Sequence, residues 1–402
     1  MDITTHIAAC SLIILICLGG CSGGGFEGSN NDESPVVAPN ALLKRVHGVA
    51  SKGIILAGNV SIFALNSNGT KGTLLKTTST SAFGAYSSSV NLAGPTLVEV
   101  SGHYTDEATG LKSEIPQNSP LRAAVDTVSS VMTIAVTPFT ELAVRKTMPL
   151  LVGGNIGEAN KLVSDIFKVD IIATQPLNLS AESFAYVGTS QVQKDYTLLL
   201  AAFSQMAHDY YGGVVSDAIA AMNNDLAKGD TLGSVVSGQL KAALTKFLQS
   251  ELNPTGIKDV SATNLSNAGG GTKIIKLATV GTLPPGISIY GITVAISLPP
   301  DVTVRVSDFE RYQTDSHVVY SSGVFPSDIY TTGHFVPAIS SSPASLTVSI
   351  PQASGSALGE FLTVVCDIPA GTTYSASDFS LPYFKVVDGN GIELQGITVD
   401  IL

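Results

Sequence analysis

The sequence predicts a multi-domain fold in which a β-sandwich, an α-helical bundle and a β jelly roll follow one another. Short alternating strands bounded by Gly and Asn turns occupy residues 44–136 and again 274–402, whereas helical periodicity occupies residues 137–252. A chain of 402 residues is long enough for about two to four domains. Only 13% of the residues are charged and none is Trp, a composition more typical of exported β-rich modules than of cytosolic enzymes.

The charge balance bears on the class of partner. The formal net charge is −11 at pH 7. Because nucleic-acid phosphates are bound by Lys and Arg, this acidic balance argues against a nucleic-acid partner.

The N-terminus carries an apolar run from Ile7 to Leu18, which ends in Leu18-Gly19-Gly20-Cys21. A run of about 12 mostly apolar residues is shorter than the roughly 20 needed to cross a bilayer, and its position is typical of an export signal. The segment Met1–His6 contains no Lys or Arg, which departs from the usual signal. A buried helix, or a signal peptide cut elsewhere, would also fit these residues.

These residues resemble the signal peptide and lipobox of bacterial lipoproteins. The resemblance covers residues 1–21 and implies cleavage between Gly20 and Cys21, with fatty acyl chains attached to Cys21. It further implies a membrane anchor made of lipid, and Ser22 after the cysteine, where an Asp would mark inner-membrane retention, favours the outer membrane. Residues 22–43, rich in Gly, Asn and Pro, are then expected to be a flexible tether facing the periplasm or the cell surface.

The cysteines restrict the remaining chemistry. Cys10 and Cys17 would leave with the signal, which leaves Cys366 without a partner for a disulfide. Cys366 lies in an apolar, strand-like run and is expected to be a buried, inert thiol. His47, His103 and His208 lack a plausible set of neighbouring ligands, so we expect neither a metal site nor another cofactor.

The first β region has strand patterns separated by Asn-Gly and Phe-Gly turns. This order resembles a carboxypeptidase-regulatory or transthyretin-like β-sandwich over about 60 residues, which implies a structural or binding module. The strands are expected at Asn59–Leu65, Leu74–Thr80, Ala85–Val90, Thr96–Gly102 and Val131–Val136.

The helical region opens with Thr137-Pro138, which predicts an N-cap residue followed by proline in the first turn. Pro149 should end this helix near Thr147. Residues at helical spacing along the later segments predict a small bundle. The further helices are expected at Gly157–Phe167, Gln191–Tyr211, Val214–Ala227 and Leu232–Leu252.

Residues 253–273 are predicted to be a second linker because Asn, Ser and Gly dominate them. Strand patterns then continue to the end and favour a sandwich or jelly roll. The segments Ile287–Ile296 and Gly359–Val364 resemble parts of a cohesin-like domain, which implies a protein- or carbohydrate-binding module. The strands are expected at Ile274–Val280, Ile287–Leu298, Val302–Val306, Val318–Tyr320, Leu346–Ile350, Glu360–Ile368, Phe384–Val387 and Ile397–Leu402.

Aromatic residues concentrate in the C-terminal region, although only 6% of the whole chain is aromatic. Such side chains can anchor partners or stack on ligands, which makes this stretch a candidate binding surface. The alternative is that the rings fill the core of the sandwich. The residues concerned are Phe309, Tyr312, Tyr320, Phe325, Tyr330 and Phe335.

No motif for catalysis occurs in the chain: there is no Gly-x-Ser-x-Gly elbow, and Asp388-Gly389-Asn390-Gly391 fits a tight turn better than a calcium loop. We therefore expect a lipid-anchored envelope protein, not an enzyme, that binds a protein or carbohydrate or has a structural role. The alternatives are an envelope enzyme whose carboxylates come together only in the fold, and an accessory subunit of an envelope complex.

Overall fold

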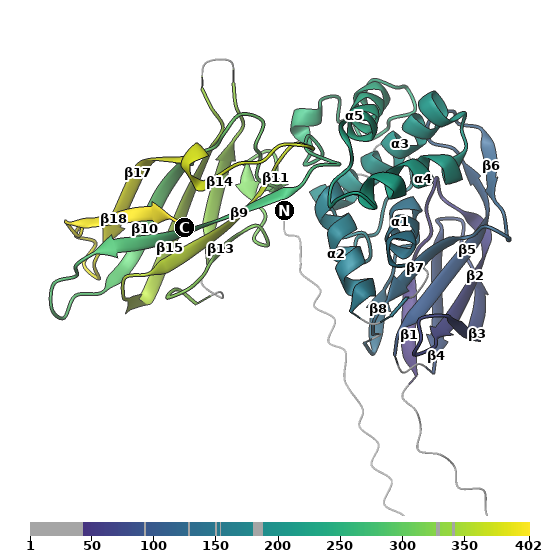
Figure 1. Ribbon diagram of the computed structural model, residues 1–402, viewed down its shortest axis with the longest axis horizontal. Coiled ribbons are helices and arrows are strands. Elements are labelled where there is room, and N and C mark those ends of the chain that lie inside the picture. The colour runs from purple at the N-terminus through teal and green to yellow at the C-terminus, as the bar shows by residue number, and fades with distance from the viewer. Residues whose placement is uncertain are drawn as a thin grey trace, which may run out of the picture. The chain divides into compact units, whose positions relative to one another are not determined.

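The computed structural model describes residues 43–402, apart from 92–93, 128, 149–150, 153, 180–187, 327–329 and 340–341. The chain passes in order through β-rich N-terminal sheets, a middle region of five helices and C-terminal antiparallel sheets (Figure 1). The predicted signal peptide, the lipobox with Gly20 and Cys21, nearly all of the tether and Pro149 lie outside the described residues.

The N-terminal region contains two sheets. In the smaller sheet, β1 lies between β4, which is antiparallel to it, and β8, which is parallel. In the larger sheet the order is β3-β2-β5-β6, and β7 pairs with the first half of β5. The strands are β1 (Lys44–Val49), β2 (Leu56–Leu65), β3 (Lys71–Ser79), β4 (Ala85–Val90), β5 (Thr96–Thr105), β6 (Lys112–Ile115), β7 (Leu121–Val125) and β8 (Val131–Thr133).

In the described part of the chain, the five helices begin within two residues of the positions expected from the sequence. The Thr137 hydroxyl accepts hydrogen bonds from the backbone N–H groups of Phe139 and Thr140, and Pro138 occupies the first helical position. The helices are α1 (Pro138–Thr147), α2 (Asn155–Phe167), α3 (Gln191–Tyr211), α4 (Val215–Leu226) and α5 (Ser234–Leu248).

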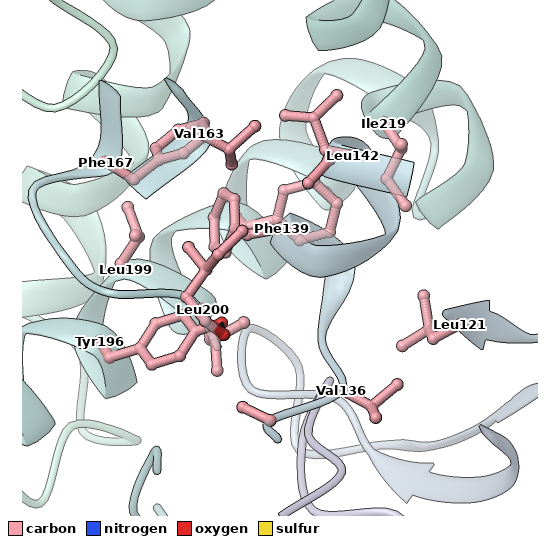
Figure 2. Packing of buried hydrophobic residues seen from close by; sticks show 14 of the residues in the cluster. Leu121, Val136, Phe139, Leu142, Val163, Phe167, Tyr196, Leu199, Leu200 and Ile219 are labelled. Carbon is pink, nitrogen blue, oxygen red and sulfur yellow. Dashed lines mark hydrogen bonds between the residues drawn. The ribbon is translucent and has the colours of Figure 1, made fainter. Parts of the chain in front are cut away.

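One hydrophobic cluster runs through the N-terminal sheets and the helices. Phe139 of α1 packs against Phe167 of α2, Phe203 of α3 and Tyr196 of α3, with its ring centroid 4.3 Å from that of Phe167 (Figure 2). The same cluster includes Val46 of β1 and other buried strand residues. The secondary structure changes at residue 136, but the core continues across that point.

The C-terminal region has a second core, which lies between two antiparallel sheets of order β11-β12-β14-β15-β10-β17 and β13-β16-β9-β18. The alternating burial along β10 gives one face to this core. The strands are β9 (Thr272–Gly281), β10 (Ile289–Ser297), β11 (Val306–Asp308), β12 (Gln313–Thr314), β13 (Val319–Ser321), β14 (Thr332–Val336), β15 (Ser345–Ser356), β16 (Glu360–Asp367), β17 (Ser380–Val387) and β18 (Ile397–Ile401).

Several strands differ from the sequence-based expectation. The predicted strand Val302–Val306 is mostly irregular, because Thr303 makes only an isolated bridge to Asp367. β1, β6, β7, β12 and β14 were not predicted: β6 is short and largely exposed, β12 has only two residues, and β14 lies within the aromatic stretch, where no clear alternation marks it.

Candidate functional site

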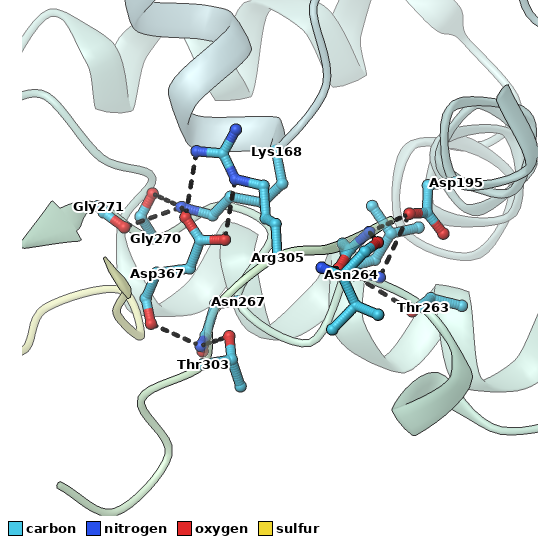
Figure 3. Close-up of polar contacts among 12 residues, drawn as sticks. Lys168, Asp195, Thr263, Asn264, Asn267, Gly270, Gly271, Thr303, Arg305 and Asp367 are labelled. Carbon is cyan, nitrogen blue, oxygen red and sulfur yellow. Dashed lines mark hydrogen bonds and ion pairs between the residues drawn. The ribbon is translucent and has the colours of Figure 1, made fainter. Parts of the chain in front are cut away.

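The predicted linker 253–273 is packed between the helices and the C-terminal sheets. Leu265 is buried in the core of the helical region. On the other side, the Asn267 side-chain amide donates hydrogen bonds to the carbonyl oxygens of Asp301 and Asp367, at 2.9 and 3.0 Å, and to the Thr303 hydroxyl (Figure 3). This segment therefore attaches the C-terminal sheets to the helices; we call the region around it the junction.

Asp367, at the end of β16, holds the first buried ion cluster of the junction. Its carboxylate lies 3.3 Å from Lys168 Nζ and 3.1 Å from Arg305 Nε. Lys168 Nζ also donates to the Gly271 carbonyl oxygen at 2.8 Å. Burial lowers the pKa of Lys168, although the attraction of Asp367 acts in the opposite direction. For Arg305 the balance is reversed: burial acts to lower the pKa, but the attraction of Asp367 outweighs it and raises the pKa. Two cations thus compensate one buried carboxylate.

Asp195, near the N-terminus of α3, is the second buried carboxylate of the junction. It is 1% exposed, like Asp367, but its hydrogen-bond donors are amides. Gln191 Nε2 lies 2.8 Å from one oxygen and Asn264 Nδ2 2.8 Å from the other (Figure 3). Burial raises the pKa of Asp195 to about 7, against the opposing effect of these hydrogen bonds.

Two hollows flank the junction. The first, which we call the polar cleft, has a volume of about 950 Å³ and is lined by Asn160, Ser164, Gln175, Gln193, Ser307 and Asp315, among others. The second, which we call the aromatic groove, has a volume of about 580 Å³ and is lined by Ser237, Lys241, Val304, Phe309, Phe335 and Pro337, among others. Both fall within the size range of small-molecule sites.

The structure divides the six predicted aromatic residues. Phe325 and Phe335 are 1% and 5% exposed and belong to the core, so these two rings follow the alternative interpretation. Tyr320, on β13, and Phe309 are half-buried. Tyr312 and Tyr330 are 37% and 70% exposed.

Phe309 and Phe335 line the aromatic groove, and Tyr312 contacts Phe309 beside it. The Tyr312 ring meets that of Phe309 edge to face, with centroids 6.4 Å apart, and Phe309 and Phe335 line the groove. Tyr312 has a φ of 51°, a left-handed conformation that is uncommon for a bulky residue. Its carbonyl oxygen accepts the Phe335 N–H at 2.9 Å, which helps hold this conformation.

Ser204 and Lys52 form a buried pair between the N-terminal sheets and the helices, and such a Ser–Lys pair could be interpreted as catalytic. Lys52 Nζ lies 2.7 Å from Ser204 Oγ and also contacts Asp106 at 2.9 Å and Glu107 at 3.2 Å. Burial opposes the charged form, but the attraction of Glu107 and Asp106 outweighs it and raises the pKa of Lys52. A lysine kept protonated in this way cannot take a proton from Ser204, so this cluster instead ties the loop after β5 and the β1–β2 turn to α3.

The remaining candidates from the sequence have local roles. His47 contacts the Thr133 hydroxyl, and His208 contacts Asp209. Cys366 is fully buried, and burial raises the pKa of its thiol. Within the part of the chain that the structure describes, no group of three or more His, Cys, Asp or Glu residues could hold a metal ion. The Asp388 carboxylate accepts the N–H groups of Asn390 and Ile392, which makes a turn at this position.

Comparisons with known proteins add little. No protein-family model matches the chain, and no curated protein does. Among solved structures, a 9R-lipoxygenase from Cyanothece PCC8801 shows a weak similarity, with 9% identity and a TM-score of 0.17 over 90% of this chain and 44% of the other. This chain therefore spans less than half of the lipoxygenase's length, and so low a score carries no argument about fold or function. Across the described residues, no helix is both long and apolar enough to cross a bilayer.

Proposed function

We propose that this chain is a lipid-anchored envelope protein with a binding or structural role, and that its C-terminal module recognises a protein or a carbohydrate at the aromatic groove. The lipobox residues Leu18 to Cys21 support the anchor, with acylation at Cys21 and an outer-membrane location. The observation that carries the recognition role is Tyr312, an exposed ring with a left-handed backbone that contacts Phe309, one of the residues that line the groove.

The finer fold assignments belong to the same proposal. Two sheets in residues 44–136 agree with a transthyretin-like β-sandwich, and two antiparallel sheets around one core in residues 274–402 agree with a cohesin-like jelly roll. Both are module types that commonly bind partners or connect other domains.

The rival function, an envelope enzyme with paired carboxylates, would place its centre in the polar cleft. Four Asp side chains line that cleft, but each already has a local partner. Asp126 accepts the Gly157 N–H, Asp165 pairs with Lys161, Asp170 accepts the Ile172 N–H and Asp315 contacts His317. These contacts favour binding over proton transfer.

The recognition role is tested by screening the full chain for ligands that raise its melting temperature, with oligosaccharide and peptide libraries as probes. Tyr312→Ala and Gly238→Trp should each abolish the shift, because Gly238 lines the groove and a side chain there meets nothing within 4 Å. The matched controls Tyr383→Ala and Gly229→Trp lie at exposed positions and should preserve it. A library without hits, or hits that survive both groove variants, would remove this role from the groove.

The anchor is tested separately by the intact mass of the membrane-extracted protein. We expect a chain that starts at Cys21 and carries added acyl mass, whereas a Cys21→Ser variant should lack that mass. An uncut or unmodified wild-type chain would contradict the anchor.

A further inference from the structure

We propose that the ionisation of Asp195 controls how tightly the C-terminal sheets are attached to the helices: the protonated side chain favours the closed junction, and the carboxylate favours its opening. This inference does not depend on what the aromatic groove binds.

Asn264 bridges the helices and the C-terminal sheets. Its Nδ2 donates both to Asp195, at 2.8 Å, and to the Val306 carbonyl oxygen of β11, at 3.0 Å. Its Oδ1 accepts the Val306 N–H at 2.7 Å. The Asn264 side chain is thus fixed by the backbone of β11 while it covers the carboxylate of α3, so Asp195 lies at a direct connection between the two regions (Figure 3).

The charged groups around Asp195 come from its own helix and from several other elements. Lys194 on the same helix attracts it electrostatically, whereas its hydrogen-bond partners Asn264 and Gln191 are neutral. Charged groups from other elements line the neighbouring polar cleft. Two of them, Lys168 and Arg305, form ion pairs with Asp367. These groups are Asp126 after β7, Lys161 and Asp165 of α2, Lys168 and Asp170 after α2, and Arg305, Asp315 and His317 of the C-terminal region.

Opening of the junction is linked to the protonation of Asp195. The buried side chain has a pKa of about 7 against an ordinary value of 3.8. If the linker separates from α3, Asp195 gains water and its pKa returns toward the ordinary value. The closed form therefore binds the proton more tightly, and raising the pH favours the open form, by roughly tenfold in the opening equilibrium between pH 6 and pH 8.

The test is amide hydrogen exchange of the full chain at pH 6 and pH 8, corrected for intrinsic exchange. The reporters are the amides of Val306, which donates to Asn264 Oδ1, and of Asn264, which donates to Asp195 at 3.4 Å. The amides of the β10–β15 ladder provide an internal reference that does not depend on any variant. We expect the junction amides to lose roughly tenfold protection relative to that ladder at the higher pH.

Two variants distinguish the effect of Asp195 from that of the titratable groups around it. Asp195→Asn, which cannot ionise, should abolish the pH response, whereas His317→Gln, in the same cleft and highly exposed, should retain it. Equal protection at the two pH values in the wild-type chain would overturn the proposal even if Asp195→Asn failed to fold. A response that disappears in His317→Gln but persists in Asp195→Asn would assign the effect to the histidine and would also overturn it.

Discussion

Asp367 and Asp195 are two carboxylates at the same junction, each 1% exposed, and they differ in what neutralises them. Asp367 contacts two cations, Lys168 and Arg305, whereas Asp195 is bonded by the amides of Gln191 and Asn264. Equal burial therefore produces different electrostatics. Cations that face a buried carboxylate compensate its lost hydration, while amide donors compensate it only in part.

The two carboxylates also differ in how they respond to a change in their surroundings. A buried ion cluster resists the loss of any one member, because the other charges are then left unpaired. A buried carboxylate without a contacting cation can take up a proton within the physiological range and so respond to its environment. The junction combines both kinds of contact on the two sides of the linker.

The largest expected effect comes from Asp367→Asn. This change leaves the buried Lys168 and the partly buried Arg305 without their counter-charge, and should lower the free energy of unfolding by about 3–5 kcal/mol. Chemical denaturation of the full chain measures it. A loss below about 1 kcal/mol would mean that the cluster is not desolvated as the structure indicates.

A smaller, pH-dependent effect is expected from Asp195→Asn. Because the folded-state pKa of about 7 is above the unfolded value of 3.8, the folded wild type binds more protons between these values and loses stability as the pH rises through that window. Relative to wild type, the variant should therefore gain about 2–3 kcal/mol in unfolding free energy from pH 5 to pH 8. Both proteins are denatured at each pH, so that the contributions of the other titrating groups cancel in the difference between their unfolding free energies. A difference that does not change with pH would contradict the contrast drawn between Asp195 and Asp367.

The smallest effect is expected from Lys276→Met. Lys276 pairs with Glu360 at 2.9 Å on the surface of the C-terminal sheets, where both side chains are partly hydrated. Removal of such a pair should change the unfolding free energy by less than about 1 kcal/mol. A loss as large as that of Asp367→Asn would show that burial does not distinguish the two clusters.

Much of the secondary structure could be predicted from local signals. Thr137 and Pro138 mark the start of α1, and the apolar spacing around Leu199 and Phe203 places α3, whose bounds match the expectation. Such signals are read within one or two helical turns, so they need no knowledge of the rest of the fold. The outer strands β6 and β7 were missed because they are short and take their register from β5.

The junction could not be predicted, because its members are distant in the sequence. Lys168, Arg305 and Asp367 meet only after two regions have folded, and the Gly- and Asn-rich segment between these regions has the composition of a free linker. One signal was present for Asp195: it lies four residues before Leu199, one helical turn away on the same side of α3, at the start of a stretch in which residues 195–207 are all buried. An acidic residue at such a position indicates a buried polar contact.

The most direct test of this account is the titration of Asp195 itself, by side-chain carboxyl ¹³C NMR of the full chain, with Asp195→Asn to assign the signal. We expect a midpoint near pH 7, because the burial of Asp195 is not offset by a contacting cation. A midpoint near the ordinary value of 3.8 would contradict it, because Asp195 would then be as fully compensated or hydrated as a surface carboxylate, and the contrast with Asp367 would disappear.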